Sequence, residues 1–338
     1  MITVIGGSGF IGSRLAKRLT EHKKQFRIVD IQQSARGYEV ISADVRSADE
    51  LSSALAGTSV IVNLAAEHKD NVTPVSLYTE VNVDGARNVC EAARRHDIQT
   101  IVFTSSVAVY SLSGGCTSEN DTPEPFNEYG RTKLQAEQIY SDWQKEEPQT
   151  RRLIIVRPSV VFGEGNRGNV YNLLRQIISG FFMMVGNGRN RKSMSYVENI
   201  ASFLEQCAHS AQPASNFALP AGIHLYNYAD QPDMDMNEFV TLVRKEMGIS
   251  SDFLRMPYWL VYMGGMLCDI IAGITSKKFA ISAIRIKKFC ANTQVASEKR
   301  KELPFTPDVS LPEGIRRTIA DLISEGDTVS EGGDEDER

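Results

Sequence analysis

The first twelve residues, MITVIGGSGFIG, constrain the fold of this chain more than any other stretch. Residues 3–5 predict a short buried strand, and SRLAKRL at 13–19 predicts a helix. Between them Gly6, Gly9 and Gly12 stand at G-x-x-G-x-x-G spacing. Such glycines permit a tight turn and a close approach of the backbone to a pyrophosphate, which the helix N-terminus then binds. The stretch therefore predicts a dinucleotide site rather than an ordinary strand–helix turn.

Asp30 ends the next predicted strand, FRIVD at 26–30, and lies 18 positions beyond Gly12. Dinucleotide-binding units place an acidic residue ~20 positions on, where it binds the adenosine ribose hydroxyls. A carboxylate there repels a 2′-phosphate, and no arginine follows Asp30 directly. The spacing favours NAD over NADP as the cofactor, and a surface aspartate that caps a turn is the alternative.

Strands and helices alternate through the first half of the chain. Further strands are predicted at 39–43, 59–66, 100–105 and 152–157, and helices at 48–55 and 81–94. This alternation predicts the α/β class, a doubly wound parallel sheet of Rossmann type, with ligands at the carboxyl ends of the strands. The expected cofactor-binding residues are Gly6, Gly9, Phe10, Ile11, Gly12, Asp30, Asp44, Val45, Leu64, Ala65, Ala66, Asn82, Tyr129 and Lys133.

Tyr129 and Lys133 form the strongest chemical signal after the glycine loop. They stand four residues apart at the start of a predicted helix that runs to Trp143, so they share one helix face. A lysine ammonium beside a phenol lowers the tyrosine pKa from its ordinary ~10, which makes the phenolate a general base. Ser106, just beyond the strand at 100–105, supplies a hydroxyl for the same substrate oxygen. The alternative is a half-exposed tyrosine beside a solvated lysine.

The chain resembles the extended short-chain dehydrogenase/reductases, the family of NAD-dependent epimerases and dehydratases. The resemblance covers roughly residues 1–323. It rests on the residues above and on the segments TSSVAVY at 104–110, RPSVVFG at 157–163 and YVENI at 196–200. It implies that Ser106, Tyr129 and Lys133 are the catalytic residues. Ser106 is preferred to its neighbour Ser105 because it directly precedes the V-A-V-Y run.

The resemblance also implies that the chain has two parts. Residues 1–165 are then the NAD-binding part, with a sheet completed by residues from about 195–225, and residues 166–323 are mainly a smaller, α-rich substrate-binding part. In nucleotide-sugar enzymes a basic turn holds the substrate diphosphate. The matching turn of this chain contains Lys192, with Arg191 beside it. A solvated basic loop is the alternative. The expected substrate contacts are His68, Ser106, Arg167, Asn169, Arg191 and Lys192.

The stretch at 256–275, MPYWLVYMGGMLCDIIAGIT, contains Asp269 as its single charged residue. Its length reaches the ~20 residues of a membrane span, but Pro257 and the two glycines in its middle weaken a spanning helix. A basic cluster follows at Lys277, Lys278, Arg285, Lys287 and Lys288. An apolar surface flanked by cations favours docking on an anionic membrane face, with a buried core helix or a span as alternatives.

Several strings are similar to the bacterial 4-epimerases of N-acetylglucosaminyl-diphospho-undecaprenol. They are AAEHKD at 65–70, RGNVYNLL at 167–174, FMMVG at 182–186, KSMSYV at 192–197, YNYADQPD at 226–233 and RIKKFCA at 285–291. This resemblance implies interconversion of GlcNAc and GalNAc on a polyprenyl diphosphate in surface polysaccharide (O-antigen) synthesis, by transient oxidation at C4. It further implies a lipid-linked sugar diphosphate as partner, at the inner face of the cell membrane.

Three other functions stay open at this point. A soluble UDP-hexose(NAc) 4-epimerase and a nucleotide-sugar 4-ketoreductase would use the same Ser106, Tyr129 and Lys133, and a non-enzymatic NAD-binding sensor would use only the cofactor site. A 4,6-dehydratase is disfavoured, because it needs an acidic pair after the catalytic hydroxyl residue, where Val107 and Ala108 stand here.

Charge and cysteine content exclude several classes of protein. Residues 324–338 hold seven acidic residues against one arginine, more than the whole net charge of −5, so the rest is near neutral and nucleic-acid binding is not expected. That tail is predicted to be disordered. Five cysteines without a C-x-x-C pair suggest a reduced cytoplasmic protein without a metal site. The strand at residue 3 leads us to expect no signal peptide, and the helix at 129–143 is a candidate homodimer contact.

Overall fold

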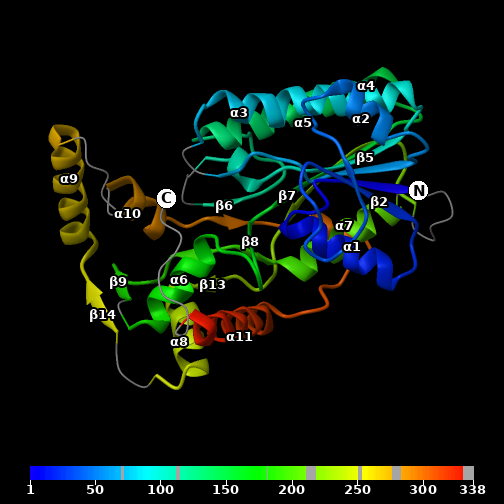
Figure 1. Cartoon of the computed structure of the whole chain (residues 1–338). Helices are drawn as coiled ribbons and strands as arrows, with labels where there is room; N and C mark the ends of the chain where they lie inside the picture. The colour runs from blue at the N-terminus through cyan, green and yellow to red at the C-terminus, as the bar shows by residue number, and fades with distance from the viewer. Residues whose placement is uncertain are drawn as a thin grey trace.

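A parallel sheet of seven strands forms the centre of the protein (Figure 1). The computed structural model describes residues 1–69, 72–111, 115–180, 182–210, 218–249, 253–275 and 283–329. The strand order is β12-β7-β5-β4-β1-β2-β3, and every neighbouring pair is parallel. The strands are β1 (Ile2–Ile5), β2 (Phe26–Asp30), β3 (Val40–Ser42), β4 (Val60–Asn63), β5 (Thr100–Thr104), β7 (Arg152–Pro158) and β12 (Gly222–Tyr228). The predicted doubly wound α/β fold is confirmed.

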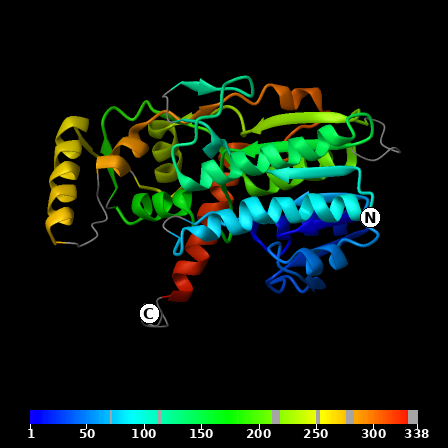
Figure 2. The ribbon, with the colours of Figure 1, turned by 90° about the horizontal axis from the view of Figure 1, so that it is seen from above.

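Helices cover both faces of this sheet (Figures 1 and 2). One face packs against α2 (Ala48–Ala54), α4 (Gly85–Arg95) and α5 (Glu128–Glu146), and the other against α1 (Phe10–Glu21) and α7 (Val197–Ser210). Side chains alternate along each strand, so Ile101 and Phe103 of β5 enter the first core and Val102 enters the second. Burial on both faces explains why these strands are continuous apolar runs.

The sheet order reverses beside β1, where β2 and β4 lie on its two sides. Chains that leave β1 and β4 at their carboxyl ends run to opposite faces of the sheet, which opens a crevice at this point. The glycine loop leaves β1 there. The topology therefore puts the predicted dinucleotide site where doubly wound sheets bind ligands.

The seventh strand lies slightly later in the chain than the sequence predicts. Residues 222–228 form β12 beside β7, so only the end of the predicted range 195–225 joins the sheet. Its beginning forms β11 (Met194–Tyr196), which pairs with β8 (Val160–Phe162), and then α7. The chain thus enters the smaller part after β8 and returns to the sheet for α7 and β12.

A third core holds the smaller part together. It is built by α6 (Asn169–Ile178), α8 (Met236–Glu246) and α11 (Leu311–Val329) with β11. A capping box fixes the start of α8, where Asp235 accepts from the backbone N–H of Glu238 and the Glu238 carboxylate accepts from that of Asp235. The remaining elements are α3 (Ser76–Tyr78), η1 (Thr79–Asp84), η2 (Val107–Val109), β6 (Cys116–Thr117), β9 (Met183–Val185), β10 (Arg191–Lys192), β13 (Met234–Asp235), β14 (Leu254–Met256), α9 (Tyr258–Thr275), α10 (Ala283–Cys290), β15 (Gln294–Val295) and η3 (Lys299–Glu302).

The first part of the acidic tail is helical, although the sequence predicts that the whole tail is disordered. Helix α11 continues through Val329, so residues 324–329 are helical. The apolar face that α11 packs on the third core includes Ile315 and Ile319, and the helix continues beyond them. Residues 330–338 of the tail lie outside the described part of the chain.

Helix α9 lies at one edge of the molecule in both views, far from the sheet (Figures 1 and 2). It packs on α10, where Gly265 meets Ile286 and the Asp269 carboxylate accepts from the backbone N–H of Ala283 at 2.9 Å. Trp259 is 62 %, Met263 55 % and Leu267 59 % exposed, so this helix is not a buried core helix.

The spanning alternative for 256–275 is not supported either. Among the described helices, none is both long enough and apolar enough to cross a membrane. In the basic cluster that follows, Lys277 and Lys278 lie outside the described residues, and Lys287 on α10 is exposed.

Candidate active site

The glycine loop forms a tight backbone cradle between β1 and α1. Gly6 has φ +76°, and a Cβ there would lie 2.7 Å from the backbone N of Ala65. A Cβ on Gly12 would lie 2.4 Å from the carbonyl oxygen of Gly6. Helix α1 begins after Gly9 without a side-chain cap, so the N–H groups of its first turn, at Phe10 and Ile11, are left for a ligand. The predicted spacing thus produces an anion-binding cradle that fits a dinucleotide phosphate.

Asp30 lies directly beside this loop. Its carboxylate accepts from the backbone N–H of Ser8 and from that of Gln32, both at 2.9 Å. The Ser8 hydroxyl donates to the carbonyl oxygen of Gln32 at 2.8 Å, so the strand end and the loop are tied together. A carboxylate has further lone pairs for ribose hydroxyls, so the donor set present fits NAD. Ser8 was missed from the sequence, where nothing distinguishes it from any loop serine.

The other expected cofactor residues lie around the same strand ends. Asp44 forms an ion pair with Arg46 at 2.6 Å, which holds the pKa of the Asp44 carboxyl below its ordinary value. Val45 is buried beneath Gly85, and Leu64, Ala65 and Ala66 follow β4 under the glycine loop.

Asn82 connects two segments near the candidate site, a role that the sequence does not predict. It is buried, and its amide nitrogen donates to the carbonyl oxygen of Glu67 at 3.1 Å and to the hydroxyl of Thr132 at 3.0 Å. Its amide oxygen accepts from the backbone N–H of Glu67 at 2.9 Å. Asn82 therefore joins the segment after β4 to helix α5, one residue before Lys133.

The Ser106 hydroxyl lies close enough to the Tyr129 hydroxyl to favour the phenolate. Ser106 caps η2, where its Oγ accepts from the backbone N–H of Ala108 at 3.1 Å. Tyr129 lies in the first turn of α5, which Asn127 caps by accepting from the N–H of Gly130 at 2.8 Å. A Cβ on Gly130 would lie 2.0 Å from the carbonyl oxygen of Ala108, so only glycine lets the two segments approach this closely.

Lys133 is 1 % exposed and lies behind Tyr129 on the same face of α5. Its Nζ is 4.2 Å from the centroid of the Phe103 ring. Burial lowers the pKa of Lys133 to about 7, against the opposing charge of Glu137.

The predicted lowering of the tyrosine pKa is not present in this geometry. Burial raises the pKa of Tyr129 to about 12, and the neighbouring Ser106 hydroxyl only partly offsets that rise. The reason is desolvation, which disfavours the phenolate and the ammonium alike when both are removed from water. An ammonium on Lys133 would favour the Tyr129 phenolate, since the two residues lie one turn apart on the same helix face.

The predicted substrate residues lie on several separate segments. His68 is exposed after β4, Arg167 is exposed before α6, and Asn169 is exposed at the start of that helix. Arg191 donates to the carbonyl oxygen of Asp233 at 2.8 Å. Lys192 donates to the carbonyl oxygen of Ala291 at 3.3 Å, and burial lowers its pKa.

Their joint action on one substrate stays a prediction. Arg191 and Lys192 form strand β10 and not the expected turn, and they pair with β13. The structure does bring Ser106, Tyr129 and Lys133 together, and it brings Asp30 to the glycine loop.

The arrangement is suited to removing a proton from a hydroxyl while a bound dinucleotide exchanges a hydride. Ser106 follows β5 at the same edge of the sheet as the glycine loop, and with Tyr129 and buried Lys133 it could supply a base and an oxygen-binding group.

Comparison with known proteins agrees with this geometry. Residues 2–215 match the NAD dependent epimerase/dehydratase family. The chain is 44% identical over 321 residues to N-acetyl-alpha-D-glucosaminyl-diphospho-ditrans,octacis-undecaprenol 4-epimerase of Escherichia coli O157:H7, covering 94% of both chains.

Two solved structures have the same fold. One is MoeE5 in complex with UDP-glucose and NAD, with a TM-score of 0.72, 21% identity, and coverage of 96% of this chain and 99% of that one. The other is UDP-glucose 4-epimerase of Thermus thermophilus complexed with NAD, with a TM-score of 0.70, 18% identity, and coverage of 95% and 98%.

Proposed function

The chain belongs to the NAD-dependent epimerase/dehydratase family, and we propose that it is a 4-epimerase that interconverts GlcNAc and GalNAc on undecaprenyl diphosphate. The observation that carries this proposal is the 44% identity to the Escherichia coli enzyme over 94% of both chains. The neighbouring Ser106 and Tyr129 hydroxyls, with buried Lys133 on the same face of α5 as Tyr129, support the proposal, because they would supply a base and an oxygen-binding group.

The proton chemistry is assigned to two hydroxyls. Tyr129 accepts the proton of the sugar O4 and later returns it, while Ser106 holds O4 by a hydrogen bond. The chemistry that NAD would supply is reversible hydride transfer at C4, which leaves no net oxidation. Lys133 in its ammonium form favours the tyrosine phenolate. Gly6, Gly12 and Asp30 would hold the cofactor.

We extend the proposal to the membrane face that carries a polyprenyl substrate. The exposed apolar face of α9 consists of Trp259, Met263 and Leu267, spaced four residues apart on one side of the helix. Lys287 is exposed on the neighbouring α10. An apolar helix face beside a cation is suited to the interface of an anionic bilayer. The protein would then be peripheral at the cytoplasmic side.

We also propose that the protein forms a homodimer. The outer surface of α5 is exposed at Gln135, Gln138 and Asp142, next to α4 in the same layer (Figure 2). A second copy packed on these helices would leave the strand ends and α9 open. Light scattering of the purified protein, with and without charge substitutions at these three positions, tests that contact.

A two-substrate assay without added NAD tests the function. The purified protein is given undecaprenyl-diphosphate GlcNAc in detergent and, separately, UDP-GlcNAc, and released sugars are scored for GalNAc. Conversion of the lipid-linked sugar alone is expected. Conversion of UDP-GlcNAc alone would replace the proposal with a soluble UDP-sugar epimerase. Conversion of neither, with NAD retained on the protein, would leave a 4-ketoreductase or an NAD-binding sensor.

Substitution of Tyr129 separates an enzyme from a cofactor-binding protein. Tyr129→Phe keeps the ring and removes the hydroxyl that exchanges the proton, so turnover should fall by about 10²–10⁴-fold. Bound NAD and the melting temperature should stay within the range of the unmodified protein. Full turnover in Tyr129→Phe would exclude the assigned base.

A further inference from the structure

One buried acidic residue beside the proposed catalytic residues has no part in the proton transfer described so far. Helix α5 carries Tyr129, Lys133 and Glu137 at intervals of four residues, so all three lie on one face. Glu137 is 5 % exposed. A carboxylate at that depth needs partners, since an isolated buried charge is strongly destabilising.

The partners of Glu137 hold its carboxylate in one position. One oxygen accepts from the Ser105 hydroxyl at 2.5 Å and from Nε of Arg157 at 2.9 Å. The other accepts from Nη2 of Arg157 at 2.5 Å. Ser105 follows β5 and Arg157 lies on β7, so two neighbouring strands fix the carboxylate against α5. Bidentate pairing with a guanidinium compensates the burial of the carboxylate.

Lys133 lies one helical turn before Glu137 on the same face of α5. Its Nζ is buried over Phe103, away from water, and burial favours the neutral amine. Glu137 opposes that tendency, while burial still brings the pKa of Lys133 to about 7.

The other titratable groups packed around this region do not supply the opposing charge. Tyr129 on α5 and Tyr110 after η2 both have pKa values raised by burial, so they are neutral at pH 7. Arg157 is a cation, and it is paired with Glu137. Its Nη1 donates to the Tyr110 hydroxyl at 2.6 Å.

We propose that Glu137 is a positioning residue that keeps Lys133 in its ammonium form, with Arg157 fixing the carboxylate. The idea rests on the proposed function, because the ammonium matters only where Tyr129 serves as the base. The charge state of Lys133 can nevertheless be measured without any substrate.

Titration of Lys133 by NMR is the direct test. Holoenzyme labelled with [13Cε]lysine is titrated from pH 5 to 10, and Lys133→Met identifies the resonance. In Glu137→Gln the midpoint of Lys133 is expected to fall by about 1 pH unit or more, as for loss of an opposite charge nearby. The same variant should have a lower kcat and a KM that is little changed. In the plot of its kcat against pH, the limb that reports Lys133 should move to lower pH.

A double variant separates a loss of stability from an effect on Lys133. Glu137→Gln alone leaves Arg157 as a buried unpaired cation, which is strongly destabilising. Glu137→Gln/Arg157→Met removes both charges, and such replacements are often neutral in stability. We expect the double variant to regain the melting temperature but to keep the lowered Lys133 midpoint. If Glu137 only supports the fold, the double variant should regain the Lys133 midpoint and activity as well.

Tyr110→Phe is the matched control at the same depth. It removes one hydrogen bond from Arg157 and leaves the Glu137 charge in place, so the Lys133 midpoint should not move. The proposal is overturned if Lys133 titrates as in the unmodified protein in both Glu137 variants. An unmodified protein that converts no sugar would contradict the proposed function and leave the NMR comparison valid.

Discussion

Gly130 determines how closely the hydroxyls of Ser106 and Tyr129 can approach. It stands between Tyr129 and Arg131 at the start of α5, directly against the carbonyl oxygen of Ala108 in η2. A methyl group at this position meets backbone rather than a flexible side chain, so the helix must move away from η2. Since η2 is capped by Ser106, that movement would separate Ser106 from Tyr129.

Gly130→Ala is therefore expected to impair both stability and turnover. Overpacking against backbone should cost about 1–3 kcal/mol in the free energy of unfolding. Turnover should fall by at least tenfold, because small displacements of catalytic groups have large effects. Urea unfolding and the sugar assay measure the two effects. Gly115→Ala, where a Cβ meets nothing within 4 Å, is the control and should change neither.

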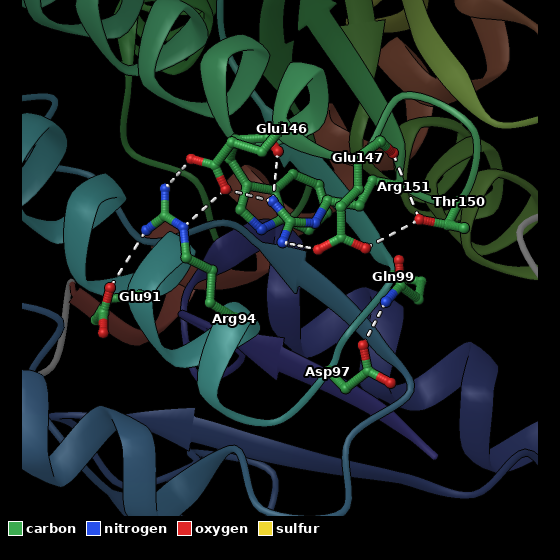
Figure 3. A network of polar contacts seen from close by, with 9 residues as sticks. Glu91, Arg94, Asp97, Gln99, Glu146, Glu147, Thr150 and Arg151 are labelled. Atoms are coloured by element: carbon green, nitrogen blue, oxygen red, sulfur yellow. Dashed lines mark hydrogen bonds and ion pairs between the residues drawn. The ribbon is translucent and has the colours of Figure 1, made fainter.

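At the scale of elements, an ion-pair network joins the far ends of α4 and α5 (Figure 3). Arg94 of α4 donates to both oxygens of Glu146 on α5, at 2.6 and 2.9 Å. Arg151, between α5 and β7, donates to Glu146 at 2.6 Å and lies 4.8 Å from the Trp143 ring centroid. The network ties the C-terminal end of the catalytic helix to the sheet.

Glu146→Gln should make folding stability less dependent on pH. The Arg94 hydrogen bonds, and then those of Arg151, lower the pKa of Glu146 from 4.5 to about 2 in the folded protein. The carboxylate therefore stabilises the fold fully above about pH 4.5 and loses that effect as the pH falls toward 2.

Solvent screens this half-exposed group, so the expected loss at pH 7 is about 1 kcal/mol. Urea unfolding at pH 7 and at pH 3 should show the difference between the two proteins shrinking. Asp142→Asn, whose exposed partner is Lys145, should have a smaller effect at both values. An equal loss at both pH values would rule out the ion-pair explanation.

Helix α9 gives an element-scale prediction for membrane binding. Trp259→Ser together with Leu267→Ser removes much of its exposed apolar face and leaves Gly265 and the contact with α10 in place. Each buried apolar side chain contributes about 1.5–3 kcal/mol, so co-sedimentation with anionic vesicles should fall by at least tenfold. Conversion of the lipid-linked sugar should fall while the melting temperature stays unchanged.

Val75→Ser controls for a general loss of apolar surface. Val75 is also well exposed but lies before α3, so this variant should bind vesicles as the unmodified protein does. Equal vesicle binding by all three proteins would remove α9 from the membrane contact.

At the scale of the whole molecule, three buried cores meet around the strand ends. Two lie on the faces of the sheet, and the third joins α6, α8 and α11. Phe10 and Ile11 of the glycine-loop helix pack against that third core, so the cofactor cradle contacts both parts of the protein. A ligand held in the cradle should therefore stabilise the molecule as a unit.

Removal of NAD should lower the melting temperature. Cofactor at a hundred times its Kd contributes about 2.7 kcal/mol, which corresponds to a rise of about 4 °C in the melting temperature of a chain of this size. Calorimetry before and after removal, and after NAD is restored, measures the effect. NADP should restore less of the melting temperature than NAD does, since Asp30 stands where a 2′-phosphate would be repelled. Equal rescue by both cofactors would contradict the assignment of Asp30.

Much of the fold could be predicted because the information is local in sequence. The glycine spacing, the acid at the end of β2 and the apolar strands each require only a few neighbouring residues, and all appear in the structure. Tyr129 and Lys133 could be paired for the same reason, since helical periodicity places them on one face. The bounds of η1 and the helical state of residues 324–329 could not be predicted, because packing decides where a helix ends.

Local sequence patterns were enough to determine the class of fold, a parallel sheet with a glycine cradle, and to predict the hydroxyl–lysine set. The electrostatics required the folded molecule, because pKa values depend on how far each group is removed from water and on charges from distant segments. Folding reversed the expected direction for Tyr129, and it brought Arg157 and Ser105 to Glu137 behind Lys133. Desolvation and long-range pairing are properties of the packed molecule, and no local pattern records them.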